Sequence, residues 1–337
     1  MRATLLAFAC LLLACGARSG PPVTAQAAPT SVAPPRVAPE GGWTTTVQTD
    51  HPAVGTVLRM ADGAELDEAA LLAAARRHRF VLLGEKHDNP DHHRLQARLL
   101  RKLGAPDAPV VFEMLDSDDA DALPALGGAP EPAALAEAVD WEASGWPDFA
   151  MYEPVFAAVH GHGARAVPGV PARATLKGVM MEGLETLSEA DAEDLRLDRS
   201  DGALVLDAHA EDIRASHCGH APESIVPAMV LGQRLKDAWL ARALRQSAVP
   251  PQAAGPVPSP AGFLVAGGGH ARPDRGVPLY LDDAFTIAFV EVPRGGGALD
   301  IADYAGAADV LWFTPRVDDE DPCAAFEEQL KKLGPVE

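Results

Sequence analysis

The sequence predicts an α/β fold with a largely parallel, buried β-sheet flanked by helices and a small helical subdomain inserted into it. Short apolar runs recur along the chain, and each has the length of a buried strand. They lie at residues 80–83, 110–112, 164–167, 263–266, 285–292 and 310–313. Helically spaced segments separate the earlier runs, as expected when crossover helices join parallel strands.

The segment after the first predicted strand carries the signals of a helix. Asn89 is a favourable N-cap, Pro90 suits the first turn, and leucines recur every four residues over residues 95–103. Gly104 is expected to end this helix as a C-terminal cap. The polar crowding before the helix is therefore explained in part by helix initiation alone.

Residues 183–247 interrupt the alternation of strands and helices. They are helix-patterned and rich in acids, with no convincing strand, so we expect a helical subdomain that lies beside the α/β core and completes a ligand cleft. The predicted organisation is a lipoprotein signal peptide at 1–15, a disordered Pro/Ala-rich linker at 16–45, an α/β domain at 46–182 and 248–315, the inserted helical subdomain at 183–247, and a C-terminal tail or helix at 316–337.

The N-terminus resembles a bacterial export signal. Arg2 precedes an apolar run at residues 5–14, which is too short to span a bilayer. The stretch Leu12-Leu13-Ala14-Cys15-Gly16 resembles a lipobox. It predicts lipidation of Cys15 and anchoring to the cell envelope, on the periplasmic or surface face of the outer membrane. The alternative is an ordinary signal peptide with an incidental cysteine.

Composition excludes some classes of partner. The 337 residues are 47% hydrophobic and 23% charged, which is a globular composition. The formal net charge is −20 at pH 7. Nucleic-acid binding needs a basic footprint, so we expect no nucleic-acid partner. The charge gives no reason to expect a polybasic membrane patch either.

Two cysteines, Cys218 and Cys323, follow the signal segment. They can form a disulfide only if the fold brings their Cα atoms within range, which the sequence does not decide. Cys218 lies in a His/Cys-rich stretch at residues 216–220, with His209 upstream. The spacing is too tight for all of these side chains to bind one ion, so we expect a structural role.

Polar side chains follow three of the predicted strands at the point where each strand ends. Gly84-Glu85-Lys86-His87 ends the first strand, Glu113 ends the second, and Gly267-Gly268-Gly269-His270 ends a later one. The carboxyl ends of parallel strands share one edge of a sheet, where ligands bind, so these side chains should converge. We expect the glycines to let the backbone turn sharply and approach a ligand closely. Taken singly, each motif also fits a solvated loop, a helix cap or a flexible turn.

The predicted catalytic residues are Glu85, His87, Glu113 and His270. Two carboxylates and two imidazoles in one cleft would repel one another or share protons unless a cation or a ligand is present. Neutral imidazole and carboxylate also bind divalent metals, so His87, Glu113 and His270 are the candidate metal ligands. On the following helix, His92 is expected to face the same site, whereas His93 is expected to be structural or solvated.

Several motifs taken together resemble the ChaN family. They are "LLGEKHDNPDHHRLQ", "VFEML", the stretch Trp141…Trp146-Pro147…Tyr152, "SHCGHAPE", "GQRLKDAWLA" and "GGGHARPDRGVP", in this order over most of residues 54–282. ChaN proteins are haem-binding, iron-regulated bacterial lipoproteins in the superfamily of TIKI, TraB and the erythromycin esterases. The paired Gly-x-x-His motifs and the glutamate of that superfamily correspond to Gly84…His87, Gly267…His270 and Glu113.

The resemblance implies a membrane-anchored, haem-binding lipoprotein involved in iron or haem uptake or handling. It implies a homodimer that encloses two stacked haems with tyrosine as the iron ligand, and outer-membrane haem or iron transport components as further partners. Tyr152 matches the family's Trp-Pro…Tyr stretch and is the candidate ligand, and further candidate ligand-binding residues are His92, Arg173 and Arg275. The family's Asn-Leu-Pro-Arg-like stretch reads Gly169-Val170-Pro171-Ala172-Arg173 here, so the arginine is retained and the asparagine is not.

The same resemblance leaves an enzymatic alternative open. TIKI-like relatives are proposed metal-dependent proteases, and the esterase relatives use a site histidine to activate water. The paired Gly-x-x-His motifs would then form a metal-dependent hydrolase of protease or esterase type, with a divalent metal ion as cofactor. A scaffold whose degenerate site only binds is a third alternative, and the sequence does not separate the three.

Overall fold

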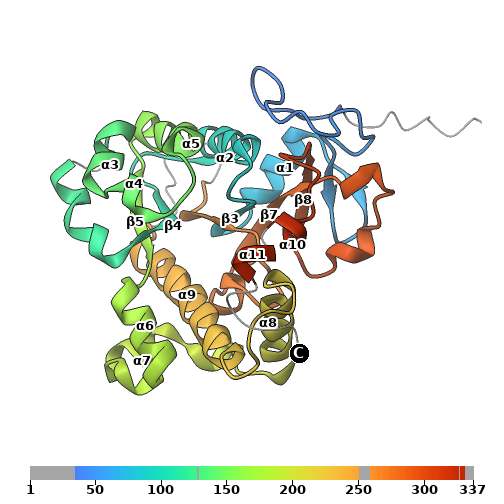
Figure 1. Ribbon diagram of the computed structural model, residues 1–337. Coiled ribbons are helices and arrows are strands. Elements are labelled where there is room, and N and C mark those ends of the chain that lie inside the picture. Colours follow the sequence, from blue (N-terminus) through green and yellow to red (C-terminus); the bar gives the residue numbers. More distant parts are fainter. Residues whose placement is uncertain (1–34, 127–128, 250–258, 326, 331–337) are drawn as a thin grey trace, which may run out of the picture. The chain divides into compact units, whose positions relative to one another are not determined.

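Parallel strands form the centre of one eight-stranded sheet (Figure 1). The computed structural model describes residues 35–126, 129–249, 259–325 and 327–330. The strands are β1 (Val57–Arg59), β2 (Ala64–Glu65), β3 (Phe80–Glu85), β4 (Pro109–Asp116), β5 (Arg165–Val170), β6 (Gly262–Gly267), β7 (Ala284–Glu291) and β8 (Val310–Thr314), in the order β2-β1-β8-β7-β3-β6-β4-β5. Strands β3 to β8 pair in parallel, whereas β1 is antiparallel to both β2 and β8. The predicted α/β fold is confirmed.

Helices cover both faces of this sheet. They are α1 (Glu68–Ala75), α2 (Pro90–Leu103), α3 (Pro132–Ala138), α4 (Trp141–Ser144), α5 (Phe149–His162), α6 (Arg173–Glu182), α7 (Glu189–Leu195), α8 (Ala203–Ser216), α9 (Val226–Ser247), α10 (Pro322–Ala325) and α11 (Glu327–Leu330). In the view of Figure 1, α2 and α5 lie above the central strands and α9 lies below them. Two large hydrophobic clusters result, one on each side of the sheet.

The residues of β3 show how both faces are buried. Val81 and Leu83 belong to the cluster that contains α2 and α5, whereas Phe80 and Leu82 belong to the cluster that contains α9. All four side chains are at most 2% exposed. Because side chains alternate between the faces of a strand, a strand covered on both sides requires an uninterrupted apolar run.

Helix α2 begins and ends where the sequence predicts, but its end has a different cause. The Asn89 side chain accepts a hydrogen bond from the Asp91 backbone amide, as an N-cap does. Gly104 has φ of −66° and ψ of 161°, which is extended rather than the left-handed conformation of a glycine cap. A Cβ at this position would lie 2.6 Å from the Leu100 carbonyl oxygen, so close packing requires the glycine.

Residues 183–247 contain helices and no strand, but α9 is not a peripheral part of the molecule. Leu235, Leu240 and Leu244 of α9 pack in the same hydrophobic cluster as the β3 side chains. Helix α9 therefore acts as the crossover helix between the parallel strands β5 and β6. It also packs against α6, α7 and α8. The insertion that we expected from the missing strands differs in this respect from the structure.

Residues 35–45, which we expected to belong to a disordered linker, are part of the folded domain; residues 16–34 of that linker lie outside the described residues. Val37 is 8% exposed, and its carbonyl oxygen accepts a hydrogen bond from the Trp312 indole. The carboxylate of Asp91 accepts hydrogen bonds from the amides and hydroxyls of Thr44 and Thr45. A buried carboxylate with several donors anchors this segment, although its Pro/Ala-rich composition suggests a linker.

Cys218 and Cys323 form a disulfide, with their Cα atoms 5.7 Å apart. Cys218 follows α8 and Cys323 lies in α10, so the bond attaches the C-terminal segment to the turn between α8 and α9. The part of the chain that the structure describes has no helix long and apolar enough to cross a membrane. Cys15 and the predicted signal peptide lie outside the described residues.

Candidate functional site

The carboxyl ends of β3, β4 and β6 bring the predicted site residues together. In the parallel register of β3 and β6, Glu85 lies beside Gly267. The backbone amide of Gly267 donates a 2.8 Å hydrogen bond to Oε2 of Glu113 in β4. His87 and His270 follow β3 and β6 closely in the chain, so the four predicted side chains meet at one edge of the sheet.

His270 lies between two carboxylates. Its Nε2 is 3.1 Å from Oε1 of Glu113, and its Nδ1 is 2.6 Å from Oδ1 of Asp237 in α9. Because a carboxylate only accepts hydrogen bonds, both ring nitrogens donate and the ring is an imidazolium. Burial alone would lower the pKa of His270, but the charge of Glu113 and then that of Asp237 raise it to about 10, even though burial raises the pKa of Asp237 itself.

Glu85 is the common partner of three side chains. Its Oε1 accepts hydrogen bonds from Nδ1 of His87 at 3.0 Å and from the Tyr152 hydroxyl at 2.7 Å. Its Oε2 lies 3.1 Å from Nε2 of His93, close enough for an ion pair but poorly aligned for a hydrogen bond. Burial would raise the pKa of Glu85, but the charge of His93 and the hydrogen bond from His87 hold it well below its usual range. Glu85 is therefore ionised.

The two halves of the cluster meet where Nε2 of His87 lies 3.8 Å from Oε2 of Glu113. Burial would raise the pKa of Glu113 as well, but His270 and then His87 hold it well below its usual range. Acidic and basic groups alternate along the cluster in the order Asp237, His270, Glu113, His87, Glu85 and His93. This alternation relieves the repulsion that we expected in the absence of a cation or a ligand.

His87 is the member of the cluster that reaches solvent. Its side chain is 36% exposed, whereas those of Glu85, Glu113 and His270 are at most 7% exposed. Burial would lower the pKa of His87, but the hydrogen bond to Glu85 and the charge of Glu113 raise it above its usual value. Since Nδ1 donates to Glu85, Nε2 is the nitrogen left for proton transfer or for binding a metal centre.

Close packing, rather than sharp turning, requires the glycines at the strand ends. Neither Gly84 nor Gly267 has a positive φ. A Cβ on Gly267 would lie 2.8 Å from Nε2 of His87, and a Cβ on Gly84 would lie 2.9 Å from the Cβ of Ala271. The sharp turns that we expected are absent at these two residues, and the close approach is to other side chains of the protein.

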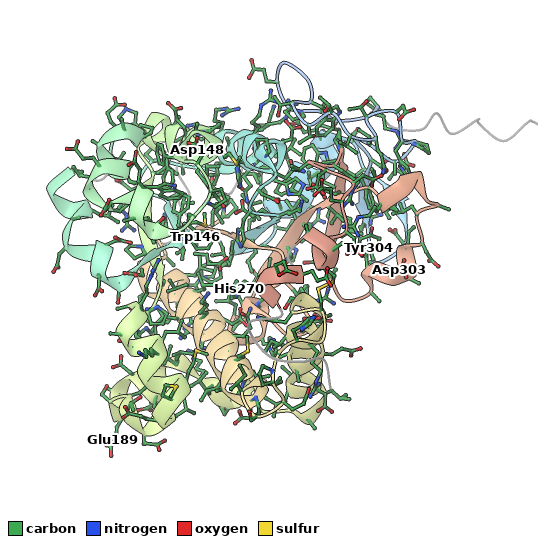
Figure 2. The ribbon with its side chains drawn as sticks, viewed as in Figure 1. Trp146, Asp148, Glu189, His270, Asp303 and Tyr304 are labelled. Carbon is green, nitrogen blue, oxygen red and sulfur yellow. A yellow bond between two sulfur atoms is a disulfide. The ribbon has the colours of Figure 1, made fainter. Side chains whose placement is uncertain are left out.

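A cleft of about 480 Å³ opens in front of Glu113, and its walls include Trp146, Arg173 and Lys236. The His87 ring meets Trp146, a wall residue, edge-on with 4.9 Å between ring centroids, so His87 lies next to the cleft although it is not one of the residues that line it. Lys236 in α9 places Nζ 3.8 Å from Oε1 of Glu113. A wider cavity of about 890 Å³ shares Trp146 with the cleft. Figure 2 shows Trp146 and His270 near the centre of the molecule.

Two of the predicted ligand-binding residues are fully buried. The Tyr152 hydroxyl donates to Glu85, and burial followed by the charge of Glu85 raises the pKa of the phenol well above its usual range. Nδ1 of His92 accepts a hydrogen bond from the Lys86 amide, and Nε2 contacts the Thr314 hydroxyl at 2.9 Å. Burial lowers the pKa of His92 to about 3, so the ring is neutral. His92 does not face the cleft as we expected.

The two predicted arginines lie in different places. Arg173 lines the cleft, and its guanidinium group donates to the Ser144 carbonyl oxygen. Arg275 lines another cavity, where it pairs with Asp212 and Asp274. Only Arg173 is therefore in position to meet a ligand in the cleft.

Sequence reasoning missed four residues of the site, which are Gln233, Lys236, Asp237 and His93. The first three lie on α9 at spacings of three and four residues, which places them on one face of the helix. Nε2 of Gln233 is 3.1 Å from Nδ1 of His270, so this face points at the cluster. The polar stripe within "GQRLKDAWLA" was the available signal. His93 was expected to be structural or solvated, and the structure instead pairs it with Glu85.

The described residues hold no group of three or more His, Cys, Asp or Glu side chains arranged to bind a metal ion. In the predicted set of His87, Glu113 and His270, both ring nitrogens of His270 already face carboxylates. A metal ligand needs a free nitrogen lone pair, and an imidazolium has none. In this arrangement the predicted set does not form a metal site.

In an α/β sheet, a cleft at the carboxyl edge with a histidine–carboxylate cluster beside it is the usual place of a ligand-binding site. The sequence model of the family described as "Haem-binding uptake, Tiki superfamily, ChaN" matches residues 71–281. The chain belongs to this family.

Two solved structures are similar to the chain. One, described as "Cofacial heme binding to ChaN of Campylobacter jejuni", has a TM-score of 0.56 and 18% identity over 76% of this chain and 95% of that chain. At this identity the likeness shows the fold. The structure of the type III effector HopBA1 has a TM-score of 0.40 and 15% identity over 78% of this chain and 98% of that chain. Comparison with curated protein sequences finds no significant match.

Proposed function

We propose that the protein binds haem in the cleft in front of Glu113, with Nε2 of His87 as the iron ligand. The observation that carries the proposal is a partly exposed imidazole in ring contact with Trp146 of the cleft wall, in a chain of the haem-binding uptake family. Glu85 accepts from Nδ1 of His87, and such a second partner orients a histidine ligand and increases its basicity.

The tyrosines of the chain fit an iron ligand less well than His87 does. Tyr152 and Tyr280 are fully buried, and their hydroxyls donate to Glu85 and Ser200. Burial is the largest cause that raises the pKa of both phenols. Tyr304 is half-buried and lines a cavity other than the cleft. A tyrosinate ligand must both ionise and reach the haem, which the two buried phenols do not do in this arrangement.

The walls of the cleft suit the two chemical parts of a haem. Trp146, Met114 and Leu176 provide apolar surface on which a porphyrin can pack. Arg173 and Lys236 provide two positive charges for the two propionates, beside the carboxyl groups of Glu113, Asp116, Asp119 and Asp140, which line the same cleft. Lys236 also lies near Glu113, so propionate binding would compete with an existing contact.

The place of action that we propose is the cell envelope. Lipidation of Cys15 would hold the protein on the periplasmic or surface face of the outer membrane, where it would work in haem or iron uptake together with membrane transport components. Detergent phase partitioning of the wild type and Cys15→Ala tests this. A variant that stays in the detergent phase as the wild type does would contradict anchoring through Cys15.

A homodimer that encloses two stacked haems is part of the proposal. The support is the ChaN structure from Campylobacter jejuni, which is described as binding haem cofacially and shares the fold. Sedimentation of the protein with and without hemin measures the change in mass. We expect dimers to increase with hemin, and monomers at saturating hemin would contradict a cofacial pair.

Hemin titration followed at the Soret band tests haem binding directly. We expect a saturable Soret band at one haem per chain. Arg173→Gln and Lys236→Gln should each weaken binding about three- to tenfold, since each removes a charged hydrogen bond to a propionate. Arg199→Gln is the matched control, because Arg199 pairs with Asp282 at the surface. The absence of a saturable band, or equal losses in all three variants, would contradict the proposal.

A second candidate function is hydrolysis with His87 as the general base. The observation that favours it is the Glu85–His87 pair, in which Nδ1 is held by a carboxylate and Nε2 is left to take a proton from water. The raised pKa of His87 makes its neutral form a stronger base. No metal ion is required for this step.

Turnover of p-nitrophenyl acetate by the full chain, with and without a chelator, tests the second candidate. We expect turnover that survives the chelator, rises with pH as His87 loses its proton, and falls at least about a hundredfold in His87→Gln. Equal turnover in His87→Gln and the wild type would exclude His87 as the base. If the chelator abolished turnover, the reaction would instead require a metal ion.

A further inference from the structure

The amino edge of the sheet, where its parallel strands begin, carries a group of basic side chains. The cations that precede β3 and β4 or begin β5, which we call the basic face, are Arg76, Arg77, Arg79, Arg101, Lys102 and Arg165. Strand β3 has six residues and is therefore about 20 Å long. The basic face thus lies at the opposite edge of the sheet from Glu85 and Glu113.

Contacts between neighbouring elements show that the basic face is continuous. The guanidinium group of Arg76 donates to the Lys102 carbonyl oxygen at 2.7 Å, which joins the turn after α1 to the end of α2. The His162 ring lies 2.8 Å from the Arg101 carbonyl oxygen, which joins α2 to α5. Helices α1, α2 and α5 lie side by side in Figure 1. The basic side chains therefore belong to one surface of the molecule.

Most cations of the basic face have no acidic partner. The arginines that make no ion pair within the described residues are Arg76, Arg77, Arg79, Arg101 and Arg165. Lys102 pairs with Glu68. Asp107 and Asp283 are further acids at this edge, and Asp283 pairs with His78. A positive excess therefore remains in a chain whose formal net charge is −20, because net charge does not record where the charges gather.

Helix dipoles account for part of this pattern. Arg101 and Lys102 lie in the last turn of α2, and Arg77 donates to a carbonyl oxygen of α1, where cations meet the partial negative charge of a helix end. Arg79 belongs to no helix, and its guanidinium group lies over the Phe80 ring, 5.2 Å from the centroid. All four of these cations are exposed. Their charges are therefore open to a partner in solution or at a surface.

We propose that the basic face docks on the phosphate groups of an anionic lipid bilayer. The cations lie along the neighbouring strands β3, β6, β4 and β5, which together are about 15 Å wide. An array of this width meets several headgroups at once and is too wide for one small anion. Guanidinium groups suit such a partner, because their paired donors match the oxygens of a phosphate.

The docking goes beyond haem binding and rests on the proposed anchor only in that the anchor brings the protein to a membrane. Residues 16–34 separate Cys15 from the described chain, and a fully extended chain of this length spans at most about 65 Å. A lipid on Cys15 alone therefore leaves the orientation of the folded domain open. Docking through the amino edge directs the carboxyl edge, with the cleft in front of Glu113, away from the bilayer.

Cosedimentation of the full chain with lipid vesicles tests the docking. All proteins carry Cys15→Ala, so that no lipid anchor contributes, and the vesicles contain phosphatidylcholine with or without phosphatidylglycerol. We expect binding to the vesicles that contain phosphatidylglycerol. High salt should weaken this binding at least about tenfold, because counter-ions screen exposed charges. Binding to phosphatidylcholine alone measures any contribution that does not depend on lipid charge.

Double variants with the same change in net charge locate the binding. Arg77→Gln/Arg101→Gln removes two exposed cations of the basic face and should weaken binding at least about tenfold. Lys177→Gln/Arg294→Gln is the matched control, because these exposed cations lie on α6 and after β7, outside the basic face, and should change binding less than about twofold. Arg77→Lys/Arg101→Lys keeps the charges and should bind within about threefold of the parent protein.

Three results would overturn the docking. They are equal binding to vesicles with and without phosphatidylglycerol, equal losses in the Gln variant of the basic face and its control, and binding to polyglutamate without binding to vesicles, which would assign the basic face to an acidic protein. Thermal melts show which variants fold, and Arg79→Gln/Arg101→Gln replaces the first variant if Arg77→Gln disturbs the end of α1. Hemin titration of Arg77→Gln/Arg101→Gln should match the wild type, so failure of the docking and failure of haem binding are distinguishable.

Discussion

Glu85 accepts hydrogen bonds from two side chains that differ in their exposure to solvent. His87 and Tyr152 both donate to Oε1, but the His87 side chain is 36% exposed and Tyr152 is fully buried. A shared carboxylate therefore orients an imidazole toward solvent and holds a phenol in the core. We therefore expect removal of the Tyr152 hydroxyl to lower stability, and removal of the His87 imidazole to abolish ligand binding.

Tyr152→Phe should lower stability and leave haem binding intact. The substitution removes a hydrogen bond to an ionised carboxylate, which costs about 1.5–3 kcal/mol. Haem affinity should stay within about twofold of the wild type, a change below about 0.4 kcal/mol, because the phenol is fully buried and donates to Glu85. Urea unfolding and hemin titration measure the two effects. Loss of the Soret band at unchanged stability would instead identify Tyr152 as the iron ligand, as the family resemblance implies.

Gly267→Ala should damage the site without unfolding the protein. Its Cβ would lie 2.8 Å from Nε2 of His87, so the imidazole must move. We expect haem affinity to fall at least about tenfold, or about 1.4 kcal/mol. Gly269→Ala is a matched control two residues away, because nothing lies within 4 Å of its Cβ. Equal affinities in the two variants would show that the close approach to His87 has no functional role.

Helix α9 is the element whose contribution to the site is least predictable from the sequence. Its leucines and alanines cover the sheet, while Gln233, Lys236 and Asp237 face the strand ends. A helix with apolar and charged positions resembles an ordinary surface helix, so its polar stripe does not by itself indicate a site. The stripe becomes informative only when the register of β4 and β6 places Glu113 and His270 opposite it.

The central strands were predictable because each is buried on both faces and has an uninterrupted apolar run. Strands β1 and β2 were not, since they have three and two residues and leave no periodic signal. The strand-end residues Glu85, His87, Glu113 and His270 were predictable from the topology of parallel sheets. The exposure of His87 and the burial of Tyr152 depend on side-chain packing, which no sequence motif records.

The disulfide is predicted to stabilise the fold and to leave the site unchanged. It joins residues 105 positions apart, from the turn after α8 to α10, and does not contact the cluster. Replacing both cysteines in Cys218→Ser/Cys323→Ser should cost about 2–4 kcal/mol of unfolding free energy, with haem affinity unchanged. Urea unfolding of the double variant and the wild type measures the cost. Equal stability of the two proteins, or a loss of haem binding, would contradict this role.

The stability of the whole molecule should depend on pH through its buried histidines. In the unfolded chain each histidine titrates near pH 6.5. His270, with a pKa of about 10 when folded, contributes stability that is fully present below pH 6.5 and is lost as the pH rises toward 10. His92, with a pKa of about 3 when folded, stays neutral in the core, so stability falls as the pH drops from 6.5 toward 3.

Chemical unfolding between pH 4 and pH 10 measures both losses of stability, which we call the alkaline limb and the acid limb. The lowered pKa values of Glu85 and Glu113 add to the loss below about pH 4.5, since protonation breaks their contacts with the histidines. His270→Gln should flatten the alkaline limb and leave the acid limb in place. An alkaline limb of the same slope in His270→Gln and the wild type would show that His270 is not an imidazolium in the folded protein.

The central claim is that the strand-edge cluster presents His87 to a haem in the cleft, and hemin titration of His87→Ala with added imidazole tests it most directly. After removal of free hemin by gel filtration, we expect the variant to show no Soret band. Its melting temperature should equal that of the wild type, and the band should return when imidazole fills the vacated position. A His87→Ala variant that retains hemin with the affinity and spectrum of the wild type would contradict the claim.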